Sequence, residues 1–444
     1  MNWMLALTRG LIGVVFLIGI AWLMSSDRKR INWRIVGSGL LLQAFLAVLV
    51  LRVAWVGAIF DWIGQGFVAM LNLSKQAAVF VFGPLSDPER SELAFGDGGG
   101  FIFATQALPS IIFFSAISSV LYYLGILQRV VMVLAWVMSR VMRLSGAESL
   151  AAAANVFVGQ TEAPLVVKPY IPHMTRSEIM ALMVGGMATI AGSVFGIYIS
   201  FLSGDDPQQQ REFAKILLCA SVMNAPAALL IAKVLLPETE RVNLNLQVAK
   251  DSVGRNLVDA LANGTSQGLK LALNVAAMII AFYACILMVN AILGELLGSF
   301  RWFGLGSLND WVAWASGGRF EMLSLQAIFG FVFAPVAWAI GIGATEVLQV
   351  GQLLGTKLFA TEFFAFLDLG VLKSEGLSSR SVFIATFALC GFANFMSIGI
   401  QIGGIGGLAP EQRPALASLG IRAMIGGMLA SCLSASIAGV LYTG

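Results

Sequence analysis

The chain alternates long apolar runs with short polar segments. Eight of the runs are long enough to cross a bilayer, because a helix of about 20 apolar residues spans its hydrocarbon core. These runs cover residues 5–23, 35–51, 101–124, 178–203, 213–236, 268–297, 381–403 and 415–441. With an even number of spans, the two termini are expected on the same side of the membrane.

The polar segment after the first run predicts the orientation. It carries Arg28, Lys29, Arg30 and Arg34, and loops rich in Lys and Arg remain in the cytoplasm. A cleaved signal peptide has its positive charge before the apolar stretch. We therefore predict an uncleaved first helix whose N-terminus lies outside the cytoplasm, in a multi-pass protein of the inner (plasma) membrane.

Two segments differ from these runs. Residues 57–84 are apolar but carry polar side chains at Asp61, Gln65, Asn72, Lys75 and Gln76. This pattern favours an amphipathic helix that lies along the membrane interface. Residues 86–100 are charged and glycine-rich, and we predict a loop there.

The composition agrees with a membrane protein. Hydrophobic residues make up 58% of the 444 residues and charged residues 11%, whereas a soluble protein carries about 25% charged residues. The net charge of +3 gives no reason to expect nucleic acid as a partner. The four cysteines are far apart in apolar runs, and His173 is the only histidine. We therefore predict an all-α polytopic membrane protein without disulfides, a transition-metal site or an organic cofactor.

Two further apolar stretches, residues 146–171 and 322–367, do not suit a straight helix. Each carries an acidic residue near its middle, together with small residues and prolines. A carboxylate at the centre of a spanning helix costs roughly 2.5–3.5 kcal/mol. A re-entrant hairpin that lines a wet cavity avoids this cost, because irregular backbone is tolerated at membrane depth only in such places.

The two stretches belong to an internal repeat. The first contains the turn Gly159-Gln160-Thr161-Glu162 before Pro164, and the second contains the pair Thr361-Glu362. A span interrupted by small and polar residues follows each turn, with Val194 and Asn394 lying 32 positions after the two glutamates. Paired interrupted segments in two halves of a chain indicate a transporter with its binding site near the bilayer midplane. We predict two re-entrant helical hairpins with inverted-repeat symmetry.

The side chains near the two turns suit a neutral, polyhydroxylated ligand with a flat ring. Carboxylates and amides can bind hydroxyl groups and the edge of a base, whereas an anionic ligand would require basic groups. Lys357 is the only nearby cation, and snorkelling or pairing with a carboxylate would explain it. A coupling cation needs oxygen ligands, and Asn155, Thr189 and the carbonyls of Val158 and Ile190 could supply them.

Four strings resemble the concentrative nucleoside transporter family, and the chain is similar to a bacterial member of it. They are GQTEAPL (159–165), ATIAGSVFGIY (188–198), TKLFATEF (356–363) and GFANFMSIGIQIGG (391–404). The resemblance implies a homotrimer of eight-span protomers, in which a mobile transport domain moves against a scaffold domain. It also implies that nucleosides are imported by symport with sodium ions or protons.

The resemblance assigns roles to individual residues. It implies that Gln160, Thr161 and Glu162 face the nucleobase beside Val194, and that Glu362, Asn394 and Ser397 hold the ribose near Phe392. The implied substrate site is thus Gly159, Gln160, Thr161, Glu162, Val194, Glu362, Phe392, Asn394 and Ser397. The sodium position falls on Asn155, Val158, Thr189 and Ile190, where a retained hydroxyl favours sodium over a proton.

The resemblance and the hydropathy pattern together predict five regions. Residues 1–100 form scaffold helices and the interfacial helix, 101–145 a scaffold span and connecting helix, and 237–320 a linker, a scaffold span and an interfacial segment. Residues 146–236 and 321–444 form the two transport-domain repeats. The hairpins are expected around 146–171 and 325–365, and the interrupted helices at 178–203 and 381–403.

Three residues depart from the family pattern. Thr361 replaces a common asparagine, Met396 a small hydroxyl residue and Asn224 a common serine, which leaves base selectivity open. The alternatives are a proton-coupled nucleoside symporter and a symporter of another small neutral polar solute, such as a nucleobase or a sugar. An intramembrane enzyme is disfavoured because no HExxH, GxSG or GxGD string lies in an apolar span. A channel is disfavoured because two single acids make no ring of charge.

Overall fold

The computed structural model describes residues 3–96, 100–204, 206–240, 254–301 and 306–442. Within these residues the chain is all-helical, with one isolated β-bridge between Arg301 and Ser307. The all-α part of the predicted fold class is therefore confirmed. Eight of the described helical segments are long and apolar enough to span a membrane, the number expected from the sequence.

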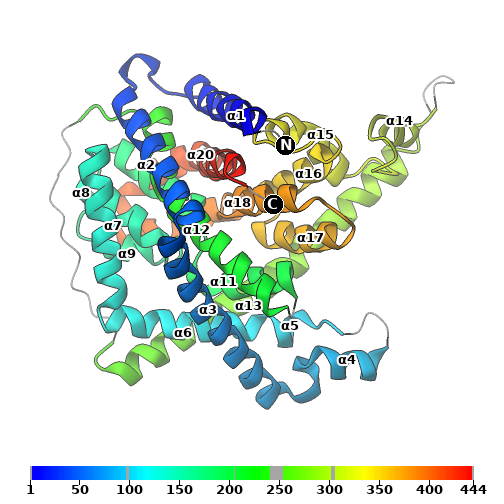
Figure 1. Cartoon of the computed structure of the whole chain (residues 1–444), viewed down its shortest axis with the longest axis horizontal. Coiled ribbons are helices and arrows are strands. Elements are labelled where there is room, and N and C mark those ends of the chain that lie inside the picture. The colour runs from blue at the N-terminus through cyan, green and yellow to red at the C-terminus, as the bar shows by residue number, and fades with distance from the viewer. Residues whose placement is uncertain (1–2, 97–99, 205, 241–253, 302–305, 443–444) are drawn as a thin grey trace.

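The set of spans differs from the prediction at one position. The run 381–403 consists of two short helices, α18 (Ser379–Leu389) and α19 (Phe395–Leu408), which agrees with the expected interruption. The eighth helix that is long and apolar enough to span is instead the segment Ala54–Phe95. Its main part, α3 (Ala54–Phe82), continues in the direction of α2 (Trp33–Arg52) (Figure 1).

The polar side chains of α3 suggested an interfacial helix, but one of them, Asp61, faces a neighbouring helix. Asp61 pairs with Lys215 of α12 (Pro207–Leu235), with 3.2 Å between carboxylate and ammonium. Gly64 lies against Ala214 on the same helix. By length and composition α3 is a candidate span. Its location along the membrane interface remains a prediction.

The segment 86–100 is not entirely a loop as predicted. Residues Pro88–Phe95 form the short helix α4. Pro88 occupies its first turn, and the Asp87 side chain accepts a hydrogen bond from the Arg90 amide. Proline and a capping aspartate at these positions favour the start of a helix, so local capping outweighs the glycines that follow.

Two long helices lie along one another on one side of the molecule. These are α6 (Leu108–Tyr123) and α13 (Leu257–Ala291), and α7 (Ile126–Met142) follows α6. Small residues allow the close approach, since a Cβ added at Gly264 would be 2.6 Å from the Ser119 Cβ. The Ser119 hydroxyl also donates to the Ala260 carbonyl at 2.8 Å. No residue in the most apolar 18-residue stretch of α13 is buried within this chain.

The interior is formed by helices from both predicted repeats. The first repeat contributes α8 (Gly146–Asn155), α9 (Ala163–Val166), α10 (Arg176–Ala188), α11 (Gly192–Ser203) and α12. The second contributes α15 (Leu325–Ala339), α16 (Val347–Phe359), α17 (Glu362–Ser374), α18, α19 and α20 (Arg413–Val440). The α17 helix extends past residue 365, the expected limit of the second hairpin.

The two ends of the chain lie close together (Figure 1). Helix α1 (Trp3–Leu23) packs against α20, and the Ser436 hydroxyl donates to the Gly10 carbonyl at 3.1 Å. The start of α1 and the end of α20 are therefore neighbours, which agrees with two termini on the same side of the membrane.

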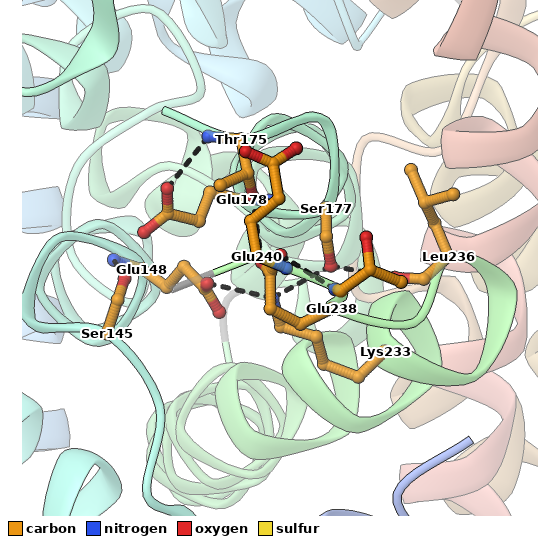
Figure 2. Close-up of polar contacts among 10 residues, drawn as sticks. Ser145, Glu148, Thr175, Ser177, Glu178, Lys233, Leu236, Glu238 and Glu240 are labelled. Atoms are coloured by element: carbon orange, nitrogen blue, oxygen red, sulfur yellow. Dashed lines mark hydrogen bonds and ion pairs between the residues drawn. The ribbon is translucent and has the colours of Figure 1, made fainter. Parts of the chain in front are cut away.

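A buried ionic cluster joins the starts of α8 and α10 to the end of α12. Figure 2 shows Lys233 between Glu148 and Glu238. The Lys233 ammonium lies 2.8 Å from the Glu148 carboxylate and 3.3 Å from that of Glu238, and it donates to the Ser177 hydroxyl at 2.9 Å. The Glu148 side chain is 0% exposed. Since an unpaired charge at this depth is costly, the cluster holds three helix ends together.

Candidate functional site

The two interrupted helices meet at their interruptions. The α10 helix ends at Ala188 and α18 ends at Leu389. The Phe392 amide of the second interruption donates to the Thr189 carbonyl of the first at 3.2 Å. A Cβ added at Gly391 would be 2.6 Å from the Ala188 carbonyl oxygen. The two backbones therefore approach so closely that only glycine fits at this position.

Asn224 of α12 connects the two helix ends. Its amide nitrogen donates to the Ala188 carbonyl at 2.8 Å and to the Cys390 carbonyl at 2.6 Å. The last carbonyls of a helix have no partner within the helix, and a single side chain satisfies one at each interruption. Asn224, a departure from the family pattern, thus has a structural role between the repeats.

Glu362 is the first residue of α17 and is 5% exposed. One carboxylate oxygen accepts a hydrogen bond from the Tyr198 hydroxyl at 2.9 Å, and the other accepts one from the Asn394 amide nitrogen at 3.0 Å. The side-chain Oδ1 of Asn394 accepts in turn from the Ser397 backbone amide at 2.8 Å and caps α19. Each repeat therefore supplies one donor to the carboxylate.

The first acidic turn is linked to the second repeat by glutamines. Gln160 donates to the Ser397 hydroxyl at 2.9 Å and accepts from the Gln401 amide nitrogen at 3.0 Å. Within the turn, the Glu162 carboxylate accepts from the Gly159 amide at 3.2 Å. The two predicted turns, which are 200 residues apart, thus lie at one place in the fold.

All nine residues of the predicted substrate site line one cavity with about 780 Å³ of space, part of it open to solvent. The remaining walls come from α11, α13 and the second repeat. They comprise Ala191, Ser193, Tyr198, Leu271, Val275, Met278, Ile279, Thr361, Phe363, Phe364, Met396 and Ile400.

The sequence prediction missed three parts of this site. Tyr198 lies in a string that carried the family resemblance, but nothing local shows that its hydroxyl meets Glu362. Gln401 is a polar residue in an apolar run, a signal that could have identified it. The wall from α13 consists of Leu271, Val275 and two neighbouring residues, which have no distinguishing chemistry.

The four residues of the predicted sodium position lie at or just after the ends of two helices, Asn155 and Val158 at the end of α8 and Thr189 and Ile190 at the end of α10. Asn155 is the last residue of α8 and is 1% exposed, and neither polar atom of its amide has a hydrogen-bond partner among the described residues. A Cβ added at Gly185 would be 3.4 Å from the Asn155 amide nitrogen, and the Thr189 hydroxyl donates to the Gly185 carbonyl at 3.0 Å. Val158 and Ile190 are buried in the adjoining segments.

These donors suit an alkali cation better than a transition metal. They are amide, hydroxyl and carbonyl oxygens, which hard cations prefer. In the part of the chain that the structure describes, no three His, Cys, Asp or Glu side chains gather as metal ligands.

Comparison with known families matches three regions of the chain. Residues 12–85 match the Na⁺ dependent nucleoside transporter N-terminus, residues 104–204 a region described as nucleoside recognition, and residues 216–439 the Na⁺ dependent nucleoside transporter C-terminus. The matched regions include both acidic turns and both interrupted helices.

Relatives of similar length and longer ones agree with this match. An uncharacterized transporter of Haemophilus influenzae is 43% identical, with 97% of this chain and 96% of the relative covered. The Sodium/nucleoside cotransporter 1 of Mus musculus is 37% identical over 97% of this chain, which spans 63% of that longer protein.

The fold matches a solved structure over nearly its whole length. The structure of CNTnw in an inward-facing substrate-bound state has a TM-score of 0.85 and 40% identity, with 98% of each chain covered. Such coverage includes the helices that carry the cavity as well as α6 and α13. This multi-pass membrane protein therefore belongs to the concentrative, Na⁺-dependent nucleoside transporter family, a family of transporters and not of enzymes.

Proposed function

We propose that the protein imports nucleosides by symport with sodium and binds its substrate in the cavity between the two acidic turns. The observation that carries the proposal is the shared cavity: Gln160 and Glu162 of one repeat and Glu362 and Asn394 of the other line the same space. The base would lie toward Gln160, Thr161, Glu162 and Val194. The ribose hydroxyls would lie toward Glu362, Asn394 and Ser397, near Phe392.

Sodium would bind at Asn155 and Thr189 with the carbonyls of Val158 and Ile190. The unpartnered amide of Asn155 supports this assignment, because a buried polar group without a partner is costly unless a ligand satisfies it. The first turn joins this position to the cavity, since only Gly159 and Gln160 separate Val158 from Thr161. Binding of the cation would therefore order the turn that receives the base.

The family's transport mechanism and this geometry support a two-part protomer. The helices from 146 to 236 and from 321 to 444 would move as a transport domain with two re-entrant hairpins related by an inverted repeat. The α6–α13 pair would belong to the scaffold, in a homotrimer. The exposed apolar side chains of α13, such as Leu273 at 61% and Ile280 at 72%, would contact lipid or the other protomers.

Two departures from the family pattern line the cavity and bear on the choice of base. Thr361 and Met396 are both wall residues, and the Thr361 hydroxyl has no partner among the described residues. We expect this hydroxyl to bind substrate in place of the common asparagine. Asn224 lies at the helix interruptions instead and is expected to leave selectivity unchanged.

The test is uptake of radiolabelled uridine and adenosine into proteoliposomes, with sodium and proton gradients imposed separately. Sodium-driven uptake of either nucleoside supports the proposal. Uptake driven by a proton gradient without sodium would mean that the coupling ion is a proton and not sodium. Glu162→Gln and Glu362→Gln should each abolish or strongly reduce uptake. Glu375→Gln is the matched control, because this half-exposed carboxylate pairs with Arg319 away from the cavity.

A further inference from the structure

Lys357 is a fully buried lysine that the proposed transport cycle does not use. It lies in the last turn of α16, five residues before Glu362, and is 0% exposed. Its ammonium donates to the Ala388 carbonyl and to the Ser431 hydroxyl, both at 2.8 Å. The expected explanations, snorkelling or a direct pair with a carboxylate, are therefore wrong.

The ammonium lies at the carbonyl end of an interior helix. Ala388 is in the last turn of α18, just before the interruption at Cys390. The final carbonyls of a helix lack helical partners and carry the negative end of its dipole. A cation at this point satisfies one carbonyl and offsets that dipole, which the cysteine and aliphatic side chains nearby cannot do.

The first repeat has an equivalent helix end. Ser378, the N-cap of α18, follows Thr175, the N-cap of α10, by 203 positions. Asn394, the N-cap of α19, follows Ala191, the N-cap of α11, by the same 203. With this offset, Gly185 in α10 corresponds to Ala388 in α18.

The two equivalent helix ends have very different polar neighbours. At the first position, a Cβ added at Gly185 would be 3.4 Å from the amide nitrogen of Asn155, whose buried amide has no partner in the described chain. The Gly185 carbonyl accepts a hydrogen bond from the neutral hydroxyl of Thr189 at 3.0 Å. The Ala388 carbonyl receives the ammonium of Lys357. Asn155 and Lys357 both belong to the end of the helix that precedes the acidic turn of their own repeat. One helix end is thus open to a cation, and the other already has one.

We propose that Lys357 is a built-in cation, which occupies at the end of α18 the place that the first repeat keeps for an exchangeable sodium ion at the end of α10. The inference rests on the proposed function, because it takes the Asn155 position as the sodium site. Lys357 keeps a positive charge at the second interruption at all times, so that only the first interruption responds to sodium. Lys357 then keeps the environment of Glu362 constant while sodium binds and leaves.

The experiment measures thermal unfolding of the purified full-length protein in sodium chloride and in choline chloride at equal ionic strength. Sodium should raise the Tm of the unmodified protein, and Asn155→Ala should remove this shift. Lys357→Ser shortens the side chain and opens a place lined by the Ala388 carbonyl and two hydroxyls. In the double variant Asn155→Ala/Lys357→Ser, sodium should again raise the Tm, by about 2–4 °C.

The matched control is Asn155→Ala/Ser431→Ala, which removes a partner of Lys357 but keeps the ammonium and should not respond to sodium. A folded Lys357→Ser double variant without a sodium response overturns the inference, and so does a response in the control. If the unmodified protein shows no sodium shift, the sodium assignment at Asn155 fails. The inference, which rests on that assignment, is then overturned with it.

A second variant applies if the serine variants do not fold. Lys357→Met fills the same space without charge or oxygen, so it should show no new sodium response and should reduce nucleoside uptake at saturating sodium at least tenfold. Uptake equal to that of the unmodified protein would overturn the inference.

Discussion

Tyr198→Phe tests whether the carboxylate of Glu362 must be held in a fixed position. The change removes only the hydroxyl that donates to Glu362 at 2.9 Å. The ring remains, including its stacking on Phe366 with centroids 4.4 Å apart. Tyr198 is 0% exposed, and without its hydroxyl Asn394 would be the remaining side-chain donor that positions the carboxylate.

The magnitude follows from the kind of hydrogen bond that is lost. A hydrogen bond to a charged group contributes about 1.5–3 kcal/mol, and each 1.4 kcal/mol corresponds to about a factor of ten. If Glu362 must be positioned to bind ribose, the ratio Vmax/KM for uridine should fall about 10- to 150-fold. The effect should be mainly in KM, because the missing interaction orients a binding group.

The assay is the initial rate of uridine uptake in proteoliposomes at saturating sodium, with Tm measured on the same preparation. Tyr123→Phe, at an exposed position near the end of α6, is the control and should behave like the unmodified protein. A Tyr198→Phe protein of normal Tm whose Vmax/KM changes less than twofold would refute the reasoning. The Glu362 carboxylate would then need no donor from α11.

Three further variants test the packing around the site. Lys233→Met leaves the buried carboxylate of Glu148 unpaired, so the protein should lose about 3–5 kcal/mol of stability, seen as a lower Tm. Adding Glu148→Gln should recover part of this loss. An unchanged Tm in Lys233→Met would contradict a structural role for the ion pair. Gly391→Ala places a Cβ 2.6 Å from the Ala188 carbonyl oxygen and should cost about 1–3 kcal/mol by overpacking, whereas Gly399→Ala, with no atom within 4 Å, should be neutral in Tm and uptake. Burial raises the pKa of Glu238, but Lys233 and the hydrogen bonds from Glu240 and Thr175 lower it more, so the folded pKa lies below its usual 4.5. The stabilising contribution of the Glu238 carboxylate is therefore complete above about pH 4.5 and is lost as the pH falls through the folded pKa. The Tm difference between the unmodified protein and Glu238→Gln should shrink over that pH range. A Tm difference that grows at low pH would contradict a lowered pKa.

The chemistry-bearing part of the site could be predicted because it is unusual in its surroundings. Glu162 and Glu362 are carboxylates in apolar runs, and the glycine and proline beside them indicate that the helix is interrupted. The structure places both on one cavity. By contrast, the partner of Tyr198 is 164 residues away along the chain, and the α13 wall is made of ordinary apolar residues. Neither leaves a local signal.

The sequence by itself determined that this is an all-helical membrane protein with eight candidate spans and two interrupted segments. Run length, composition and the places where polar residues break a run are local properties. Each directly changes the free energy of placing the segment in the hydrocarbon core of the bilayer.

Only the tertiary structure decided which apolar runs lie inside the protein. Every residue in the most apolar stretch of α10–α11 is buried and none in that of α13, although both runs are strongly apolar. The reason is that lipid and protein interior are nearly the same solvent for an apolar side chain, so hydropathy cannot distinguish them. The tertiary structure also decided the hydrogen-bond partners of Tyr198, Asn224 and Lys357, because each of these contacts joins helices that are distant in the chain.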